Sequence, residues 1–357
     1  MIKNKISIVL IMNIFLTIIV NADITKSSHN LIDFLFNSKL NTDSILIHKD
    51  GRKLLERYGR SYNKNTKHIM WSVSKSFTSA VVGIAIDEKK IKLNQSICDF
   101  YQKLSADKCK ITILDLLHYK AGFGWVEQYE PLVISDLSKV TEGDVLQMIY
   151  GEGHGDMANY VLNKPLAYKP GTTLQYNTGT PNILMDILKR VYKNKYDDLV
   201  EGFLNNLGID SYVWSKDRSG TYIGGSHLFA TPSLMLEFGK LYLNKGIVNN
   251  KKVLSSKWID FSTQQVKVKK IVDHQDIPGI DIVESIGAMW WLNSELRGKV
   301  PWPDAPKDTF IAWGHWGQFI ILIPSLNMVI VRTGQDKTES FDINQFIKLS
   351  IQYAEGL

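Results

Sequence analysis

Residues 72–75 of this chain read Ser-Val-Ser-Lys, and residues 77–86 continue as Phe-Thr-Ser-Ala-Val-Val-Gly-Ile-Ala-Ile. The apolar run predicts a buried helix, with Ser72 at its first turn and Lys75 three residues on, on the same face. A serine hydroxyl becomes a good nucleophile when a base takes its proton, and an amine can be that base once burial lowers its pKa. The helix N-terminus adds positive potential and free N–H groups. The segment therefore predicts a covalent-catalysis site.

The Ser-x-x-Lys pattern by itself is weak, because it also begins at Ser61 and at Ser105. Average composition yields roughly one or two such matches by chance in a chain of this length. Ser61 precedes a polar stretch with no apolar face, and Ser105 lies in a short polar segment between two cysteines. Only Ser72 opens a segment with the character of a core helix. The alternative is that Ser72 is merely an N-cap, a position at which serine is favoured.

The N-terminal segment 1–22 has the parts of a Sec-type signal peptide: two lysines, an apolar run over 6–20, and small residues up to Ala22. The run is short for a bilayer span and contains polar residues, which favours a cleaved signal over an uncleaved anchor helix. We therefore expect the mature chain to start near Asp23. The protein is expected to be exported, to the periplasm or the medium.

The composition argues against nucleic-acid and membrane partners. The chain has 357 residues and a formal net charge of +6, which falls to +4 when the two signal lysines are removed. This charge is mild, and no lysine/arginine block is interleaved with aromatic residues. The mature part, about 335 residues, contains no second apolar run of membrane-spanning length and suffices for one large domain or two closely packed ones.

Cys98 and Cys109 are the only cysteines, and they lie close together in a chain expected to be exported. A disulfide is the natural expectation in an oxidising compartment, with two free buried thiols as the alternative. The eight histidines are nowhere closer than 19 residues apart, so the sequence has no local zinc motif. It also lacks a Walker loop, a dinucleotide-binding glycine fingerprint and a Gly-x-Ser-x-Gly elbow. We expect no metal and no cofactor.

Strands are predicted at both ends of the chain and helices in the middle. The N-terminal strands, 44–48 and 53–58, flank an Asp-Gly turn. Four C-terminal segments are rich in aromatic and β-branched residues. The pattern indicates an α+β fold in which strands from both ends build one antiparallel sheet. The C-terminal strands are predicted at 288–293, 309–314, 318–323 and 327–333, and the helices at 30–36, 72–87, 112–119, 142–151, 156–162, 181–192, 231–244 and 342–354.

This order predicts one domain over 23–357. Its α/β parts are expected at 23–90 and 215–357, and a mainly helical part at 91–214.

Two further clusters have chemical content. Tyr176 lies in a turn-rich segment before a predicted helix, where it can carry a proton if cationic neighbours lower its pKa; the alternative is a core or capping tyrosine. Residues 313–318 read Trp-Gly-His-Trp-Gly-Gln. Glycines such as Gly317 let a substrate backbone approach a strand closely. His315 can orient a carbonyl and the Gln318 N–H can donate to an oxyanion, with a structural histidine as the alternative.

Ser-x-x-Lys, Tyr-Asn-Thr-Gly and His-x-Gly follow one another in this order along the chain. Together they resemble the serine β-lactamase and penicillin-binding-protein superfamily, on the side of class C β-lactamases, esterases and 6-aminohexanoate-dimer hydrolases. The resemblance covers most of the mature chain. It implies a β-lactamase/transpeptidase-like fold, with an antiparallel sheet flanked by helices and a mainly helical insert. Further matching segments are 71–79, 111–118, 225–232 and 317–324.

The resemblance also implies a role for each matching residue. Ser72 would be the acylated nucleophile, with Lys75 as its base or as the cation that activates Tyr176. Tyr176 would carry the proton to the leaving group and later help activate the deacylating water. His315 would occupy the place of the lysine in the Lys-Thr/Ser-Gly motif. The N–H groups of Ser72 and Gln318 would form the oxyanion hole.

Tyr129, on the loop after Gly122, would line the substrate mouth as in the amide-hydrolase branch. Two departures distinguish this chain from class C β-lactamases. The segment 176–178 lacks the asparagine, two residues after the tyrosine, that those enzymes use against the substrate amide. His315 replaces a permanently charged lysine, and a neutral imidazole binds a carboxylate less well. Both departures favour the esterase and linear-amidase branch.

We therefore expect an exported serine hydrolase that cleaves an ester or small amide through an acyl-Ser72 intermediate, with a small molecule as its partner. A β-lactamase or DD-carboxypeptidase with the same chemistry is one alternative. A catalytically silent cell-wall-binding homologue is the alternative from another class. The presence of Ser72, Lys75 and Tyr176 together argues against that last alternative.

Overall fold

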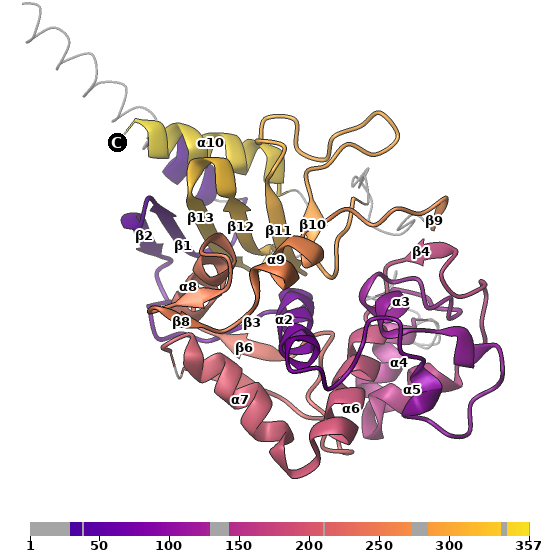
Figure 1. The fold of residues 1–357 in the computed structure, drawn as a ribbon. Coiled ribbons are helices and arrows are strands. Elements are labelled where there is room, and N and C mark those ends of the chain that lie inside the picture. Colours follow the sequence, from indigo (N-terminus) through magenta and orange to yellow (C-terminus); the bar gives the residue numbers. More distant parts are fainter. Residues whose placement is uncertain are drawn as a thin grey trace, which may run out of the picture.

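A six-stranded antiparallel sheet, built from both ends of the chain, forms the centre of the protein (Figure 1). Its strands are β1 (Thr42–Lys49), β2 (Arg52–Tyr58), β10 (Trp291–Leu292), β11 (Phe310–Gly314), β12 (Gln318–Ile323) and β13 (Met328–Gly334). They lie in the order β10-β11-β12-β13-β1-β2, so the predicted α+β arrangement is confirmed. The computed structural model describes residues 29–37, 39–128, 143–209, 211–272, 285–336 and 341–356.

The hairpin between β1 and β2 closes on the Asp-Gly pair that the sequence singled out. Asp50 and Gly51 have φ values of 51° and 73°. Positive φ at both central residues is the requirement of a type I′ turn, whose twist suits two antiparallel strands. The Asp50 N–H also donates to the Asn327 carbonyl, with an N···O distance of 3.0 Å. The N-terminal hairpin is thereby joined to the turn between β12 and β13.

Helices cover both faces of the sheet. On one face, α10 (Ile343–Glu355) and the helical residues 29–35 pack on one hydrophobic core. On the other, α2 (Val73–Asp87) and α8 (Pro232–Leu243) pack on a second core (Figure 1). The two cores arise because successive strand residues point to opposite faces. The segment that opens with Ser-x-x-Lys therefore forms a helix packed directly against the sheet.

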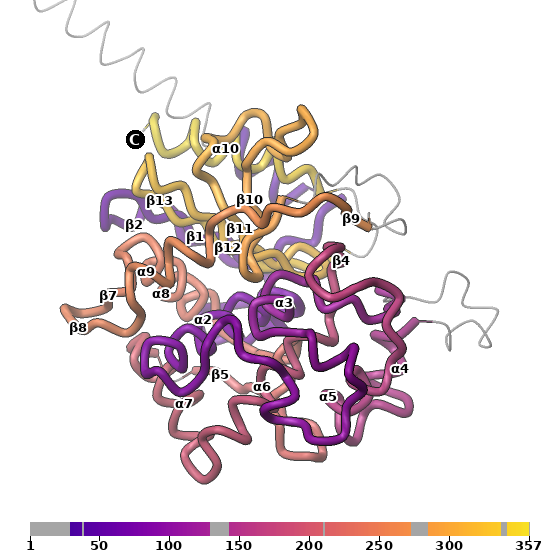
Figure 2. The backbone as a smooth tube through the Cα atoms, turned by 45° about the vertical axis from the view of Figure 1, so that its right-hand side comes forward, coloured from indigo at the N-terminus to yellow at the C-terminus, as the bar shows by residue number. Residues whose placement is uncertain are grey.

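The chain between α2 and β6 is mainly helical and lies beside α2, away from the large sheet (Figure 2). Its helix α6 contacts α2, α3 and α5. The helices are α3 (Ile113–Leu117), α4 (Asp144–Tyr150), α5 (Met157–Asn163), α6 (Thr180–Tyr192) and α7 (Tyr196–Asn206), and α9 (Ser256–Ser262) follows later. The short strands are β3 (His68–Ile69), β4 (Thr173–Gln175), β5 (Tyr212–Trp214), β6 (Leu228–Ala230), β7 (Ile247–Val248), β8 (Lys251–Lys252) and β9 (Lys270–Val272). The sequence patterns did not predict α7, α9 or these strands.

The strand expected at 288–293 is wrong in extent, because only β10 is extended. The Ala288 N–H donates to the Ser262 carbonyl of α9, and Met289 has a φ of 67°. The chain bends here, and residues 288–290 therefore do not pair with the sheet, which the chain joins only at β10. Of the two tryptophans that suggested a longer strand, Trp291 lies on β10, whereas Trp290 is fully buried in the core.

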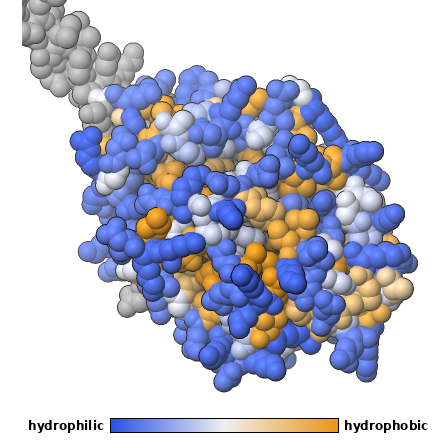
Figure 3. All heavy atoms as spheres, in the orientation of Figure 1, coloured by the Kyte–Doolittle hydropathy of each residue, from blue (hydrophilic) through white to orange (hydrophobic). Residues whose placement is uncertain are grey.

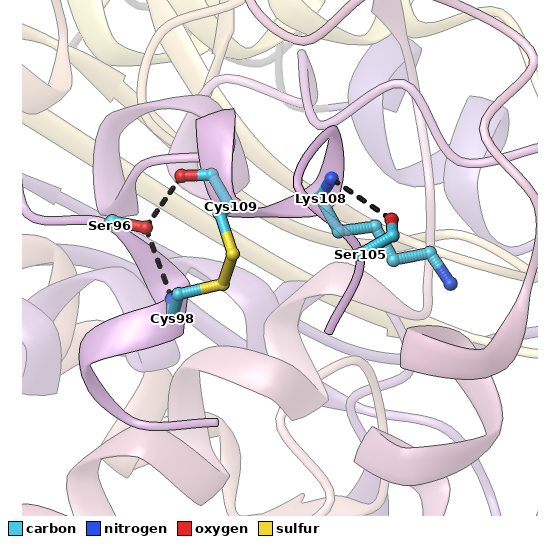
Figure 4. Close-up of a disulfide and its surroundings, with 5 residues drawn as sticks. All are labelled: Ser96, Cys98, Ser105, Lys108 and Cys109. Atoms are coloured by element: carbon cyan, nitrogen blue, oxygen red, sulfur yellow. Dashed lines mark hydrogen bonds between the residues drawn. A yellow bond between two sulfur atoms is a disulfide. The ribbon is translucent and has the colours of Figure 1, made fainter. Parts of the chain in front are cut away.

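Cys98 and Cys109 form a disulfide with a Cα–Cα distance of 5.1 Å (Figure 4). The Ser96 hydroxyl bridges the same two turns, since it accepts from the Cys98 N–H and donates to the Cys109 carbonyl. Figure 4 also shows the Ser-x-x-Lys at Ser105, where the backbone N–H of Lys108, not its amine, donates to the serine. That amine donates instead to a backbone carbonyl in α5.

Polar and charged residues cover most of the face drawn in Figure 3, with hydrophobic side chains between them near the middle. Among the described residues, the large hydrophobic side chains that are exposed are Val126, Tyr150, Val213 and Ile247, which lie far apart in the sequence. No helix in these parts of the chain has both the length and the apolar character that a bilayer span requires.

Candidate active site

Ser72 and Lys75 meet at the N-terminus of α2. The Lys75 amine donates to the Ser72 hydroxyl with an Nζ···Oγ distance of 2.6 Å, and to the Gly225 carbonyl at 2.9 Å. One helical turn separates the two residues, which is why their side chains lie on the same face. Ser61, by contrast, is an exposed turn residue. Helix context therefore distinguishes Ser72 from both other Ser-x-x-Lys serines.

Ser72 occupies the N-cap position, but its hydroxyl makes no capping hydrogen bond. Its backbone is already helical, with φ −67° and ψ −11°, so the hydroxyl is directed at Lys75 rather than at the backbone of α2. The turn into the helix passes through Trp71, which has a φ of 46°. Such a conformation is rare for a bulky residue and is retained mainly at functional sites. The structure does not support the interpretation of Ser72 as a simple helix cap.

Burial lowers the pKa of Lys75 to about 7, while the nearby charge of Glu127 opposes that shift. The side chain is 1% exposed, and desolvation disfavours the charged ammonium. At neutral pH a large share of the amine is therefore unprotonated. An unprotonated amine within hydrogen-bond distance of a serine hydroxyl meets the geometric and acid–base requirements of a general base.

Tyr176 lies beside this pair. The Lys75 Nζ is 4.9 Å from the centroid of the Tyr176 ring, which is buried and packs between Tyr119 and Trp291. Gly225 brings its carbonyl to Lys75 because it packs against the Thr178 backbone, where a Cβ would clash. The structure thus brings Tyr176 to the pair predicted from the sequence.

Glu127 is a residue of this site that the sequence reading missed. Its carboxylate accepts hydrogen bonds from the Thr178 N–H at 2.8 Å, from the Thr178 hydroxyl and from the Trp125 indole N–H. These hydrogen bonds hold the turn that follows Tyr176 in place. The charge of Glu127 also raises the pKa of Lys75, against the effect of burial. An acidic residue directly after the apolar stretch 123–126 was the available signal.

The end of β11 presents a backbone N–H beside Ser72. Hydrogen-bonding direction alternates along a strand, and the Thr309 carbonyl accepts from the Asn293 N–H on the β10 side. The register to β12 is unbroken up to Gly314, so the Gly314 carbonyl points toward β12. Because the peptide is trans, the His315 N–H points the opposite way, to the outer edge of β11.

That outer edge adjoins the start of α2. Gly314 lies against the Met70 carbonyl, where a Cβ would clash, and the His315 ring packs edge-on against Trp71 at 5.8 Å between ring centroids. The edge of β11 that carries the His315 N–H therefore adjoins the start of α2, where Ser72 lies. An oxyanion hole requires two such N–H donors, and those of Ser72 and His315 are the candidates.

Gln318 is placed differently from the expectation that its N–H donates to an oxyanion. It pairs with Gly314 across β11 and β12, so the same alternation directs its N–H at the Gly314 carbonyl. Its side-chain amide donates to the Gly334 carbonyl at 2.5 Å, on β13. The Gln318 N–H thus lies on β12, one strand farther from Ser72 than β11. Gly317, with a φ of 85°, completes the tight turn between the strands.

An aromatic wall lines the same side of the site. The Trp71 ring contacts the rings of His227, His315 and Trp316, with centroid distances of 6.1, 5.8 and 5.6 Å. Tyr129, expected at the substrate mouth, lies outside the described residues. In the described parts of the chain, no three His, Cys, Asp or Glu side chains gather as a metal site would need.

Comparison with known proteins finds a matching family model and similar relatives. The family model Beta-lactamase matches residues 32–345. The 6-aminohexanoate-dimer hydrolase of Paenarthrobacter ureafaciens is 23% identical over 305 residues, 82% of this chain and 72% of the relative.

Solved structures show the same fold. A Bacillus anthracis protein, provisionally named a 6-aminohexanoate-dimer hydrolase, superposes with a TM-score of 0.68 at 22% identity, over 91% of this chain and 80% of the other. A family VIII carboxylesterase superposes with a TM-score of 0.67 at 15% identity, over 94% and 98%.

Proposed function

The chain belongs to the Beta-lactamase family of serine hydrolases, and on that premise we propose that it cleaves an ester or a small linear amide through an acyl-Ser72 intermediate. The observation that carries the proposal is the 2.6 Å hydrogen bond between the Lys75 amine and the Ser72 hydroxyl, with the lysine buried and its pKa near neutral. A catalytically silent homologue has no need to bury a lysine against a serine in this way.

The proposed reaction begins when neutral Lys75 takes the Ser72 proton and Oγ attacks the substrate carbonyl. The N–H groups of Ser72 and His315 stabilise the oxyanion of the tetrahedral intermediate. Tyr176, next to the ammonium of Lys75, passes the proton to the leaving alcohol or amine as the bond to the acyl carbon breaks. A water molecule then attacks the acyl-enzyme, and its proton passes to Tyr176 or Lys75. That proton returns to the Ser72 Oγ as the bond to the acyl carbon breaks, which frees the acid and restores the hydroxyl.

The polar groups of the site favour esters and linear amides over β-lactams. Thr178 stands at the position where class C β-lactamases have their amide-binding asparagine. Its hydroxyl and its N–H both donate hydrogen bonds to Glu127. Glu127 also adds a negative charge near Lys75, which disfavours the carboxylate that β-lactams carry. The aromatic wall around Trp71 supplies apolar surface for an acyl or alcohol group.

Export is part of the proposal. The signal-like segment 1–22, which lies outside the described residues, and the Cys98–Cys109 disulfide both support it. N-terminal sequencing of the protein recovered outside the cytoplasm should begin near Asp23. An intact Met1 on that protein would contradict cleavage.

The function is tested by active-site labelling and a substrate panel. A fluorophosphonate probe should label Ser72 in the wild-type protein, as mapped by mass spectrometry, and Ser72→Ala should abolish labelling and turnover together. The panel comprises p-nitrophenyl esters, linear amide oligomers, nitrocefin and a D-Ala-D-Ala peptide. Faster turnover of nitrocefin or the peptide than of the esters would overturn the ester and amide assignment. Labelling of another residue in active protein would refute the acyl-Ser72 intermediate.

A further inference from the structure

Arg332 lies on the far side of the turn that holds the proposed oxyanion hole. It extends from β13 and is 0% exposed, so its charge is buried beneath the loop between β11 and β12. Its Nη1 donates to the Gly317 carbonyl at 3.0 Å. The guanidinium fits there because residue 317 is glycine, since a Cβ would clash with Nη1. The close approach of a charged group to one backbone carbonyl needs an explanation beyond packing.

The surroundings fix the guanidinium in place. Nε and Nη2 donate to the Thr42 hydroxyl at 3.1 and 2.8 Å, and Asp336 pairs with Nη1 at 2.7 Å. The Asp336 carboxylate in turn accepts from the Asn41 N–H at 2.8 Å. Desolvation lowers the pKa of Arg332 while Asp336 opposes the shift, and an arginine stays charged throughout.

A chain of peptide groups links this cation to the oxyanion hole. The Gly317 carbonyl and the Gln318 N–H belong to one peptide, and strand alternation directs that N–H at the Gly314 carbonyl. The Gly314 carbonyl and the His315 N–H belong to the next peptide in the series. Each hydrogen bond polarises the amide that makes it, so a cation on the first carbonyl strengthens the last N–H as a donor.

We infer that Arg332 is a positioning residue for catalysis, which orients and polarises the hydrogen-bonded peptides ending in the His315 N–H. The inference rests on the proposed function of Ser72 and His315. Arg332 would touch no substrate and would still contribute to the stabilisation of the oxyanion. Direct loss of an oxyanion donor costs about 10²–10³ in rate, so loss of its polarisation is expected to cost less, about 3- to 30-fold.

The test compares an oxygen ester with the matching thionoester, both with a p-nitrophenol leaving group. A thiocarbonyl sulfur accepts hydrogen bonds weakly, so an oxyanion hole favours the oxygen ester. Arg332→Gln should lower kcat/KM for the oxygen ester by about 3- to 30-fold and for the thionoester by less, which reduces the oxygen-to-sulfur preference. Affinity for phenylboronic acid, which forms a tetrahedral adduct with a catalytic serine, should fall by a similar factor in a tryptophan-fluorescence titration.

Thr42→Val is the matched control, because it removes a different hydrogen-bond partner of the same guanidinium without touching Gly317. It should leave the oxygen-to-sulfur preference unchanged. If Arg332→Gln does not fold, Arg332→Lys takes its place, since the shorter side chain draws the charge away from Gly317 and should also reduce the preference.

Either of two results would overturn the inference. One is an unchanged preference in the folded Arg332 variant, and the other is an equal reduction in Thr42→Val, which would make the network only structural. Failure of the proposed function looks different: the wild-type protein would turn over neither ester, and Ser72 would remain unlabelled. That result would remove the basis of both proposals.

Discussion

The amine of Lys75 lies 2.6 Å from the hydroxyl of Ser72, and the same amine is held by the Gly225 carbonyl, 150 residues further along the chain. Both of these hydrogen-bond partners, the Ser72 hydroxyl and the Gly225 carbonyl, are uncharged groups. Burial of Lys75 therefore disfavours the ammonium relative to the neutral amine, which is the form that the proposed mechanism requires.

Lys75→Met should raise stability at pH 7 and abolish turnover. The folded protein holds the pKa of Lys75 near 7, below the ordinary value of 10.5, so the unfolded chain binds more protons between these pH values. Wild-type stability should therefore rise as pH increases from about 7 toward 10.5, by up to about 1.4 kcal/mol per unit of pH. Methionine removes this dependence, and thermal unfolding from pH 6 to 10 should show a flatter profile. A steeper profile in the variant would contradict the assigned pKa.

The acid limb of the pH–rate profile should reflect Lys75. Activity should rise through about pH 7 as the ammonium loses its proton. Glu127 raises the pKa of Lys75, so Glu127→Gln should lower it and move the limb of kcat/KM to lower pH. Glu152→Gln, at an exposed position, is the control and should leave the limb in place. A limb that moves to higher pH in Glu127→Gln would refute the electrostatic role.

Tyr176→Phe should reduce kcat by about 10²–10⁴, the range typical of a lost acid–base group. Tyr119 is the matched control, because its ring packs at 5.0 Å from that of Tyr176 and burial raises its pKa well above the ordinary value. Tyr119→Phe should therefore change kcat less than tenfold, as roughly expected for a tyrosine that stays protonated. Equal losses of kcat in the two variants, measured with one ester substrate, would show that the loss comes from disturbed packing and not from acid–base chemistry.

The backbone of residue 315, rather than its ring, should carry the oxyanion contact. His315→Pro removes the N–H and should lower kcat by about 10²–10³, whereas His315→Ala keeps it and should lose far less. Circular dichroism checks that both variants fold. His315→Lys should in addition move the substrate panel toward carboxylate-bearing compounds. Similar kinetics for the proline and alanine variants would assign the contact elsewhere.

Gly314→Ala should displace the start of α2. A Cβ there would clash with the Met70 carbonyl, two residues before Ser72, so both melting temperature and kcat should fall. Overpacking of this kind costs about 1–3 kcal/mol. Gly155→Ala meets nothing within 4 Å and should leave both quantities unchanged. A neutral Gly314→Ala would show that α2 and β11 are not in close contact.

The sequence by itself determined the fold class and the pairing of Ser72 with Lys75, the proposed nucleophile and base. Ser72 and Lys75 are one helical turn apart, so the period of an α-helix alone brings them together. The Asp-Gly turn and the C-terminal segments rich in aromatic and β-branched residues likewise predicted one sheet, because turn and strand signals are local. Tyr176 was predicted as a third site residue because its motif lies between Ser-x-x-Lys and His-x-Gly along the chain.

Only the tertiary structure decided the electrostatics and the backbone donors. Glu127 reaches Thr178 and Lys75 across turns that no local pattern relates, so the sequence did not reveal it. The proposed oxyanion donor is His315 rather than Gln318, because the direction of a backbone N–H depends on strand pairing, which side-chain identities do not encode. Arg332 likewise gains its relation to the site through two neighbouring strands. Short-range periodicity places residues along an element, and long-range pairing decides what their polar groups face.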